Sequence, residues 1–60
     1  MSTGELIRII NYVDDINTTL RRITAFVSGM EPDERKRIAE SLRAASGNLN
    51  TLISTLEKGA

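Results

Sequence analysis

Apolar residues recur at alternating steps of three and four along the first half of the chain. They are Leu6, Ile9, Val13, Ile16, Leu20, Ile23, Val27 and Met30. Because an α-helix turns once in about 3.6 residues, this spacing places them along one side of a single long helix. A repeat of seven residues sustained over several turns is typical of helices that pack lengthwise in coiled coils and bundles. We therefore predict a helix over residues 3–28 with one continuous apolar seam, the first seam.

A second seam with the same spacing occupies the second half of the chain. Its members are Ile38, Leu42, Ala45, Leu49, Leu52 and Leu56. Gly47 is its weak point, because glycine costs about 1 kcal/mol relative to alanine inside a helix. The seam nevertheless keeps its phase across this glycine, whereas a break in the helix would be expected to reset the phase. We predict one continuous helix over residues 32–57, with fraying of the last three residues of the chain.

Local signals mark where the two helices begin and end. Ser2 and Glu5 have the spacing of a capping box at a helix start. Gly29 is expected to end the first helix in the left-handed conformation, and Pro32 suits the first position of the next helix. A turn over residues 29–31 would then join the helices into one antiparallel hairpin. The chain is interpreted as a single all-α domain over residues 1–60.

A lone hairpin gives each seam only one neighbouring helix and leaves much of both seams in water. A chain of 60 residues buries only about 60% of its unfolded surface, and this one has no cysteine for a disulfide. Self-association is therefore the expected source of stability, and symmetric dimers are its commonest form. We predict that two copies form a homodimeric four-helix bundle whose core consists of both seams without Met30. The seams leave open whether the two turns lie at the same end or at opposite ends.

The composition offers little for catalysis or metal binding. The chain has no histidine and no cysteine, the residues that zinc prefers and that most often act as bases or nucleophiles. Asp14 and Asp15 are neighbours on a helix, so their side chains diverge by about 100° and cannot chelate one ion unless a symmetry-related copy helps. A three-residue turn is also too short to build a pocket. We expect a non-enzymatic protein without a cofactor or a metal.

Charge and hydropathy limit the classes of partner and the location. Eight basic and eight acidic residues give a formal net charge of zero, which argues against a dedicated nucleic-acid binder because such proteins usually have a basic surplus. No apolar run approaches the roughly 18 residues of a membrane span, and no basic flank precedes an apolar core at the N-terminus. We expect a cytoplasmic location and no membrane partner.

Five large apolar residues of the predicted helices lie outside the two seams. Ile10 and Ile53 flank the seams, so we expect them to widen the bundle core. Two interpretations stay open for Ile7, Tyr12 and Phe26. They either widen the core too, or they form an exposed patch of the kind that marks a protein-binding surface, where helix-on-helix recognition would be the expected mode. The candidate partner-binding residues, all on the first helix, are Ile7, Asn11, Tyr12, Asp15, Arg22 and Phe26.

The second half of the chain resembles the Rop (repressor of primer) family of small plasmid-encoded RNA-binding proteins. The resemblance consists of Asp33-Glu34, Ile38, Glu40-Ser41-Leu42 and Leu49, in the family's order and spacing. It implies a dimeric four-helix bundle, and it would imply RNA binding through lysine, asparagine, phenylalanine and glutamine on the first helix. Only Asn11 matches these contact positions, because the others fall on Gly4, Asp15, Thr19 and Phe26. The resemblance therefore supports the fold more than the RNA function.

Three hypotheses for function follow. The first is a regulatory protein-binding module, such as an inhibitor, anti-activator or adaptor of phage or plasmid origin, which acts as a homodimer on a larger protein. The second is a Rop-like RNA-binding regulator of plasmid copy number that uses Arg8, Asn11, Thr19 and Arg22. The third is a structural or assembly subunit of a larger particle. The absence of any catalytic pattern favours the first, because a small chain without a reactive site acts by contact.

Overall fold

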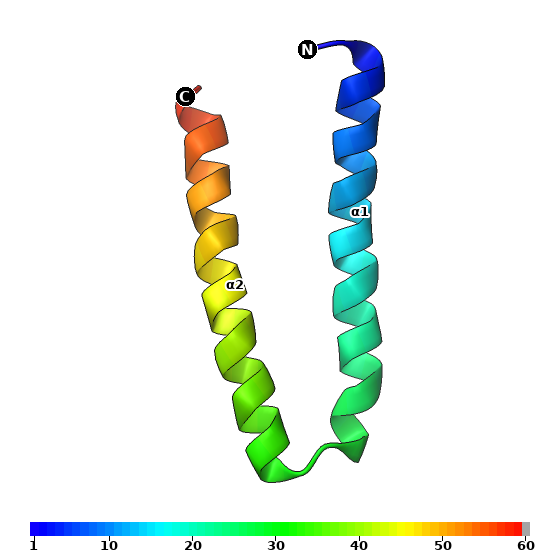
Figure 1. Ribbon diagram of the computed structural model, residues 1–60, viewed down its shortest axis with the longest axis vertical. Helices are drawn as coiled ribbons and strands as arrows, with labels where there is room; N and C mark the ends of the chain where they lie inside the picture. Colours follow the sequence, from blue (N-terminus) through cyan, green and yellow to red (C-terminus); the bar gives the residue numbers. More distant parts are fainter. Residues whose placement is uncertain (60) are drawn as a thin grey trace.

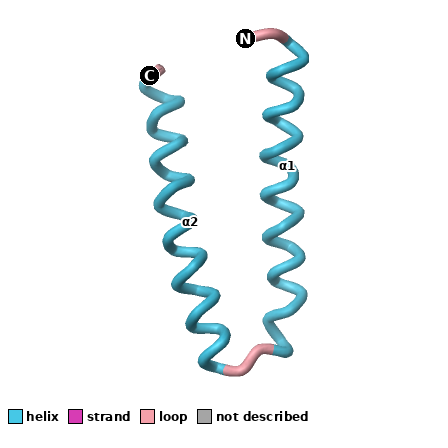
Figure 2. Tube along the Cα trace, viewed as in Figure 1, coloured by secondary structure: helices cyan, strands magenta, loops and turns pink. Residues whose placement is uncertain are grey.

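The computed structural model describes residues 1–59, which form two long helices. Helix α1 spans Thr3–Phe26, a short 3₁₀ helix η1 spans Val27–Gly29, and helix α2 spans Pro32–Lys58 (Figure 1). Among the described residues, only Met1, Ser2, the Met30–Glu31 connection between η1 and α2, and Gly59 are outside these helices (Figure 2). The prediction of an all-helical chain is thus confirmed for the described residues, and α2 ends one residue later than predicted.

Both helices begin with side-chain caps. The Glu5 amide donates a hydrogen bond to Ser2 Oγ (3.2 Å), and the Ser2 hydroxyl donates in turn to Glu5 Oε1 (3.1 Å). At α2 the sequence analysis had assigned no cap before Pro32. Glu31 fills this role in a capping box, because its amide donates to Glu34 Oε1 (2.9 Å) while its own carboxylate accepts from the Glu34 amide. These bonds satisfy amides that helix geometry leaves without partners.

The predicted left-handed conformation of Gly29 is wrong. Helix α1 stops at Phe26 and tightens into η1, so that the Val27 amide donates to Thr24 O and the Met30 amide to Val27 O. These bonds between residues three apart satisfy terminal carbonyl groups without a residue of positive φ. Met30 and Glu31 then run extended, with ψ of 140° and 158°. An extended Glu31 is expected, because a proline disfavours the helical conformation of the residue before it.

Helix α2 is continuous through Gly47, as the phase of the second seam predicts. Its last residue is Lys58, so the predicted fraying is wrong for that position. Gly59 adopts the left-handed conformation (φ 70°) and is the only described residue with positive φ, which makes it the C-terminal cap. Ala60, which the fraying prediction also included, lies outside the described residues.

The two helices form an open V that is one helix thick. They are antiparallel, and the distance between them increases from the turn toward the chain ends (Figure 1). The molecule measures 45 × 21 × 10 Å, and 10 Å is about the diameter of a single helix with its side chains. Within residues 1–59, no two Cα atoms twelve or more positions apart come within 8 Å of each other. Neither α1 nor α2 contains a segment long and apolar enough to cross a membrane.

Gly47→Ala should raise the free energy of unfolding by about 1 kcal/mol, because Gly47 is helical and a Cβ added there meets no atom within 4 Å. Urea denaturation at one fixed protein concentration would measure this change. Gly59→Ala is the matched control. It should give no gain or a loss, since alanine is strained at a φ of 70°. Equal gains at both positions would contradict the assignment of the two conformations.

Candidate functional site: the apolar groove between the helices

The two seams face each other across an open groove rather than a closed core. No residue among 1–59 is buried, and only five are half-buried: Thr18, Ile23, Met30, Ile38 and Ala39. Members of both seams line the groove along the turn half and the middle of the hairpin; they are Ile16, Leu20, Ile23, Val27, Met30, Ile38, Leu42, Ala45, Leu49 and Leu52. We call this surface the inner groove. Most of the residues that line it thus belong to the two seams.

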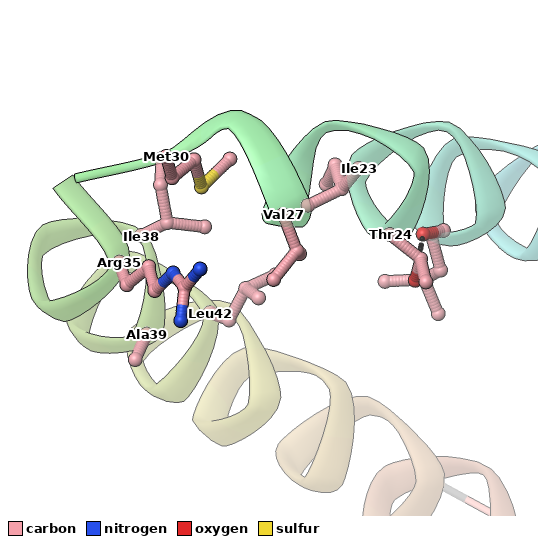
Figure 3. A pocket seen from close by; sticks show the side chains of 9 residues that line it. Ile23, Thr24, Val27, Met30, Arg35, Ile38, Ala39 and Leu42 are labelled. Atoms are coloured by element: carbon pink, nitrogen blue, oxygen red, sulfur yellow. Dashed lines mark hydrogen bonds between the residues drawn. The ribbon is translucent and has the colours of Figure 1, made fainter. Parts of the chain in front are cut away.

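The turn end of the inner groove is its narrowest part. Met30 and Ile38 lie side by side there, with Val27 on the opposite wall (Figure 3). The Arg35 guanidinium also points into this space from the first turn of α2 (Figure 3). An arginine can cover apolar surface with its methylene groups while its charged end stays in water. The spacing of the second seam does not predict a place in the groove for Arg35 or Ala39, because both lie beside this seam rather than on it.

The middle of the inner groove is wider and almost entirely aliphatic. It encloses about 550 Å³, compared with about 280 Å³ at the turn end. Ile16 and Leu20 line it from α1, and Ala45, Leu49 and Leu52 from α2. Ser46 and Asn48 are its polar members, and neither is charged. On a surface of this kind, removal of apolar area from water is the main available interaction.

Toward the chain ends the seams separate and no longer share a pocket. Leu6, Ile9, Val13 and Leu56 are exposed and do not line the groove. The exposed fraction of the seam leucines of α2 therefore rises along the helix, from 36% at Leu42 to 71% at Leu56. Within one chain these residues have no neighbour across the groove, so their predicted place in a core depends on a second molecule.

The five large apolar residues of the helices that lie outside the seams are also exposed. Phe26 exposes 69% of its surface, and Ile7, Ile10, Tyr12 and Ile53 are exposed as well. Ile7 and Phe26 are nineteen positions apart, which is about 28 Å along a helix. A single chain therefore does not gather them into one patch. The polar candidates Asn11, Asp15 and Arg22 are exposed on the same helix.

Four threonine hydroxyls are bound to the backbone of their own helix. Thr18, Thr24, Thr51 and Thr55 each donate to the carbonyl four residues earlier, at 3.0 to 3.1 Å. Thr24 also lines the turn end of the groove, and its bond to Leu20 O satisfies its hydroxyl there (Figure 3). Its place one turn after Leu20 is the sequence signal that could have identified it as part of the groove wall.

The chain matches no family model, no curated protein and no solved structure. Within residues 1–59, no group of three or more histidine, cysteine, aspartate or glutamate side chains is arranged to hold a metal ion. The geometry of the chain is therefore the basis for its functional interpretation, and its main feature is the inner groove.

Substitutions at Thr24 should distinguish a wall residue from a polar contact. If Thr24 contributes its methyl group to a covered groove, Thr24→Val should be at least as stable as the wild type. Thr24→Ser should lower the free energy of unfolding by up to about 0.8 kcal/mol, the value of one buried methyl group. Thermal or urea unfolding at equal protein concentration would measure the order. A variant Thr24→Val that is clearly less stable than Thr24→Ser would mean that the hydroxyl is the important group.

Proposed function

We propose that the chain is a non-enzymatic protein-binding module that acts as a homodimer. The inner grooves of two copies would close on each other in a four-helix bundle, and the outer surface would contact a larger partner protein as an inhibitor, anti-activator or adaptor does. The observation that supports this proposal is the inner groove itself, a continuous apolar surface on a molecule one helix thick in which no described residue is buried.

The accessible surface of the chain shows how much more of it is in water than in a compact protein of the same mass. A compact protein of 6.6 kDa would expose about 3,900 Å² by the scaling of monomeric proteins. The hairpin exposes 5424 Å², so about 1,500 Å² more surface is in water than a compact monomer of this mass would leave. A typical stable interface buries about 800 Å² on each partner, so the excess is large enough for an interface.

The same scaling supports a second copy of the chain as the molecule that covers the inner groove. A compact bundle of twice the mass would expose about 6,400 Å², whereas two separate hairpins expose twice 5424 Å². Pairing would therefore remove about 4,400 Å² from water, within the roughly 2,000–5,000 Å² of obligate homodimers. A second copy also supplies seams of the same length and spacing, so every seam would find a matching neighbour.

The candidate contact surface for the partner protein lies on α1. Tyr12 and Phe26 are the only aromatic residues of the chain and both are exposed. Aromatic side chains are enriched in protein interfaces, because they remove a large apolar area from water at low entropic cost. The Rop-like alternative would instead use the polar side chains of α1 for RNA. The acidic pair Asp14-Asp15 and the zero net charge count against it.

Ile16→Asp should abolish folding and dimerisation together, because it places an unpaired charge in the middle of the inner groove. Leu42→Asp should act in the same way. Circular dichroism and sedimentation equilibrium on the same samples would test both. Asp14→Asn is the control on the same helix, and its free energy of unfolding should stay within about 0.5 kcal/mol of the wild type. A helical, monomeric Ile16→Asp variant would refute the proposed coupling.

The partner-binding role can be tested by affinity capture from lysate with tagged protein, with and without ribonuclease. We expect a protein to be retained in both conditions and to be lost from the double variant Tyr12→Ser/Phe26→Ser, which should still dimerise. Asp14→Asn serves as the control that should retain it. A structured RNA that disappears with ribonuclease would support the Rop-like alternative, and growth of the protein into larger oligomers would support an assembly subunit.

A further inference from the structure

A second regular stripe of residues runs along α1, on the side turned away from the inner groove. Its members recur at alternating steps of four and three, as in the first seam, and all are exposed; they are Arg8, Tyr12, Asp15, Thr19, Arg22 and Phe26. Thr24 lines the groove, and Phe26, two positions later, lies about 160° around the helix from it. We call this stripe the outer seam.

The charges of the outer seam alternate in sign along the helix. Arg8, Asp15 and Arg22 follow one another at seven-residue intervals, which are about 10.5 Å along a helix. Uncharged residues lie between them and after them, and two of these, Tyr12 and Phe26, are the only aromatic residues of the chain. The order positive, negative, positive is the same from either end. The outer seam therefore combines apolar anchor points with a defined charge order.

Most of the outer-seam charges have no opposite charge within reach on their own helix. Every residue three or four positions from Asp15 or Arg22 is uncharged; these residues are Asn11, Tyr12, Thr18, Thr19, Ala25 and Phe26. On α2, by contrast, Asp33 precedes Arg37 and Lys36 precedes Glu40 by four positions, the spacing of ion pairs within a helix. The charges of Asp15 and Arg22 are thus available to a second molecule.

We propose that the partner protein presents one amphipathic helix that packs lengthwise on the outer seam, a proposal that rests on the protein-binding role. Its contacting face would have an acidic, a basic and an acidic side chain at seven-residue intervals, opposite Arg8, Asp15 and Arg22. Apolar side chains between them would contact Tyr12 and Phe26. Oppositely charged residues that flank an apolar contact select partners in the same way in coiled coils.

The seven-residue interval favours a helix over an extended segment. A helix returns a side chain to the same face after seven residues, at the same 10 Å or so that separates the outer-seam charges. A strand repeats after two residues, at about 6.7 Å, so its side chains would fall out of register with these charges. Because the charge order is the same from both ends, it fixes the register of the bound helix and allows either direction.

The negative charge in the middle of the outer seam favours a protein helix over a nucleic acid. A nucleic-acid backbone has a negative charge at every step, so it would be repelled at Asp15 and by the adjacent Asp14. A helix can place a basic side chain at this point and acidic side chains on both sides of it. Each exposed ion pair contributes little alone, so selectivity depends on the sum over all three positions.

Two synthetic helical peptides of about 21 residues, or three heptads, would test the proposal by fluorescence anisotropy with the full chain. They differ only at three positions seven apart, which are Glu, Lys and Glu in one peptide and Lys, Glu and Lys in the other. We expect the Glu-Lys-Glu peptide to bind about tenfold more tightly, since every charge pair becomes repulsive in the other complex. The triple variant Arg8→Glu/Asp15→Lys/Arg22→Glu should reverse the preference.

The matched control is Arg37→Glu/Glu40→Lys/Arg43→Glu, which makes the same change in net charge at exposed positions of α2. It should keep the preference for Glu-Lys-Glu. Circular dichroism and sedimentation would verify that both variants fold and associate like the wild type.

Equal affinity of the wild type for the two peptides, or binding of neither, overturns the inferred charge order. So does an unchanged preference in the α1 variant. In each of these cases the protein-binding role is judged separately, by whether capture from lysate depends on Tyr12 and Phe26. An RNA stem-loop that binds the wild type while neither peptide does overturns the inference in favour of the Rop-like alternative.

Discussion

The structure depends on one constraint: each helix has an apolar seam along its whole length, and a single layer of two helices cannot cover both. A helix in a four-helix bundle has two adjacent neighbours and one diagonal neighbour. In this chain α1 has one neighbour, and only near the turn. The half-buried seam residues Ile23 and Ile38 accordingly lie close to the turn, while Leu6 and Leu56 at the far end are in water. On α2 the exposed fraction of the seam leucines rises with distance from the turn. Along the first seam, apart from the half-buried Ile23 and Met30, it stays between 40% and 51%.

Local structure could be predicted well from the sequence because its causes lie within a few residues. The Ser2–Glu5 cap, the position of Pro32 and the continuity of α2 through Gly47 each depend on hydrogen bonds or spacing over one or two turns. The end of α1 was harder to predict. Glycine after a helix usually signals a left-handed cap, but the carbonyls of Thr24 and Val27 are satisfied here by amides three residues later, and Gly29 needs no unusual conformation.

The candidate site could be predicted only in part, for a related reason. Seam spacing identifies residues that share a face of one helix, so it found Ile16, Leu20, Leu49 and Leu52 on the groove. It does not give the angle between the helices, which depends on contacts far apart in the sequence. The widening of the groove and the inclusion of Arg35 and Ala39 follow from that angle. The apolar residues outside the seams gave a weaker signal of a binding site, because single exposed apolar side chains are normal on protein surfaces.

The residues of the inner groove and those on the outer face of α1 are under different physical constraints. This supports the proposal that the groove binds a second copy and the outer face of α1 binds the partner protein. In the proposed dimer the groove residues would have to match another apolar surface along the turn half and the middle of the hairpin, and a copy of the same chain would do so by symmetry. The outer positions of α1 have no such constraint, yet they include both aromatic residues of the chain beside polar and charged ones. If the grooves close on each other, the aromatic side chains remain the largest apolar groups available to a partner. Dimerisation would then do more than stabilise the fold, because twofold symmetry would present every outer position of α1 twice.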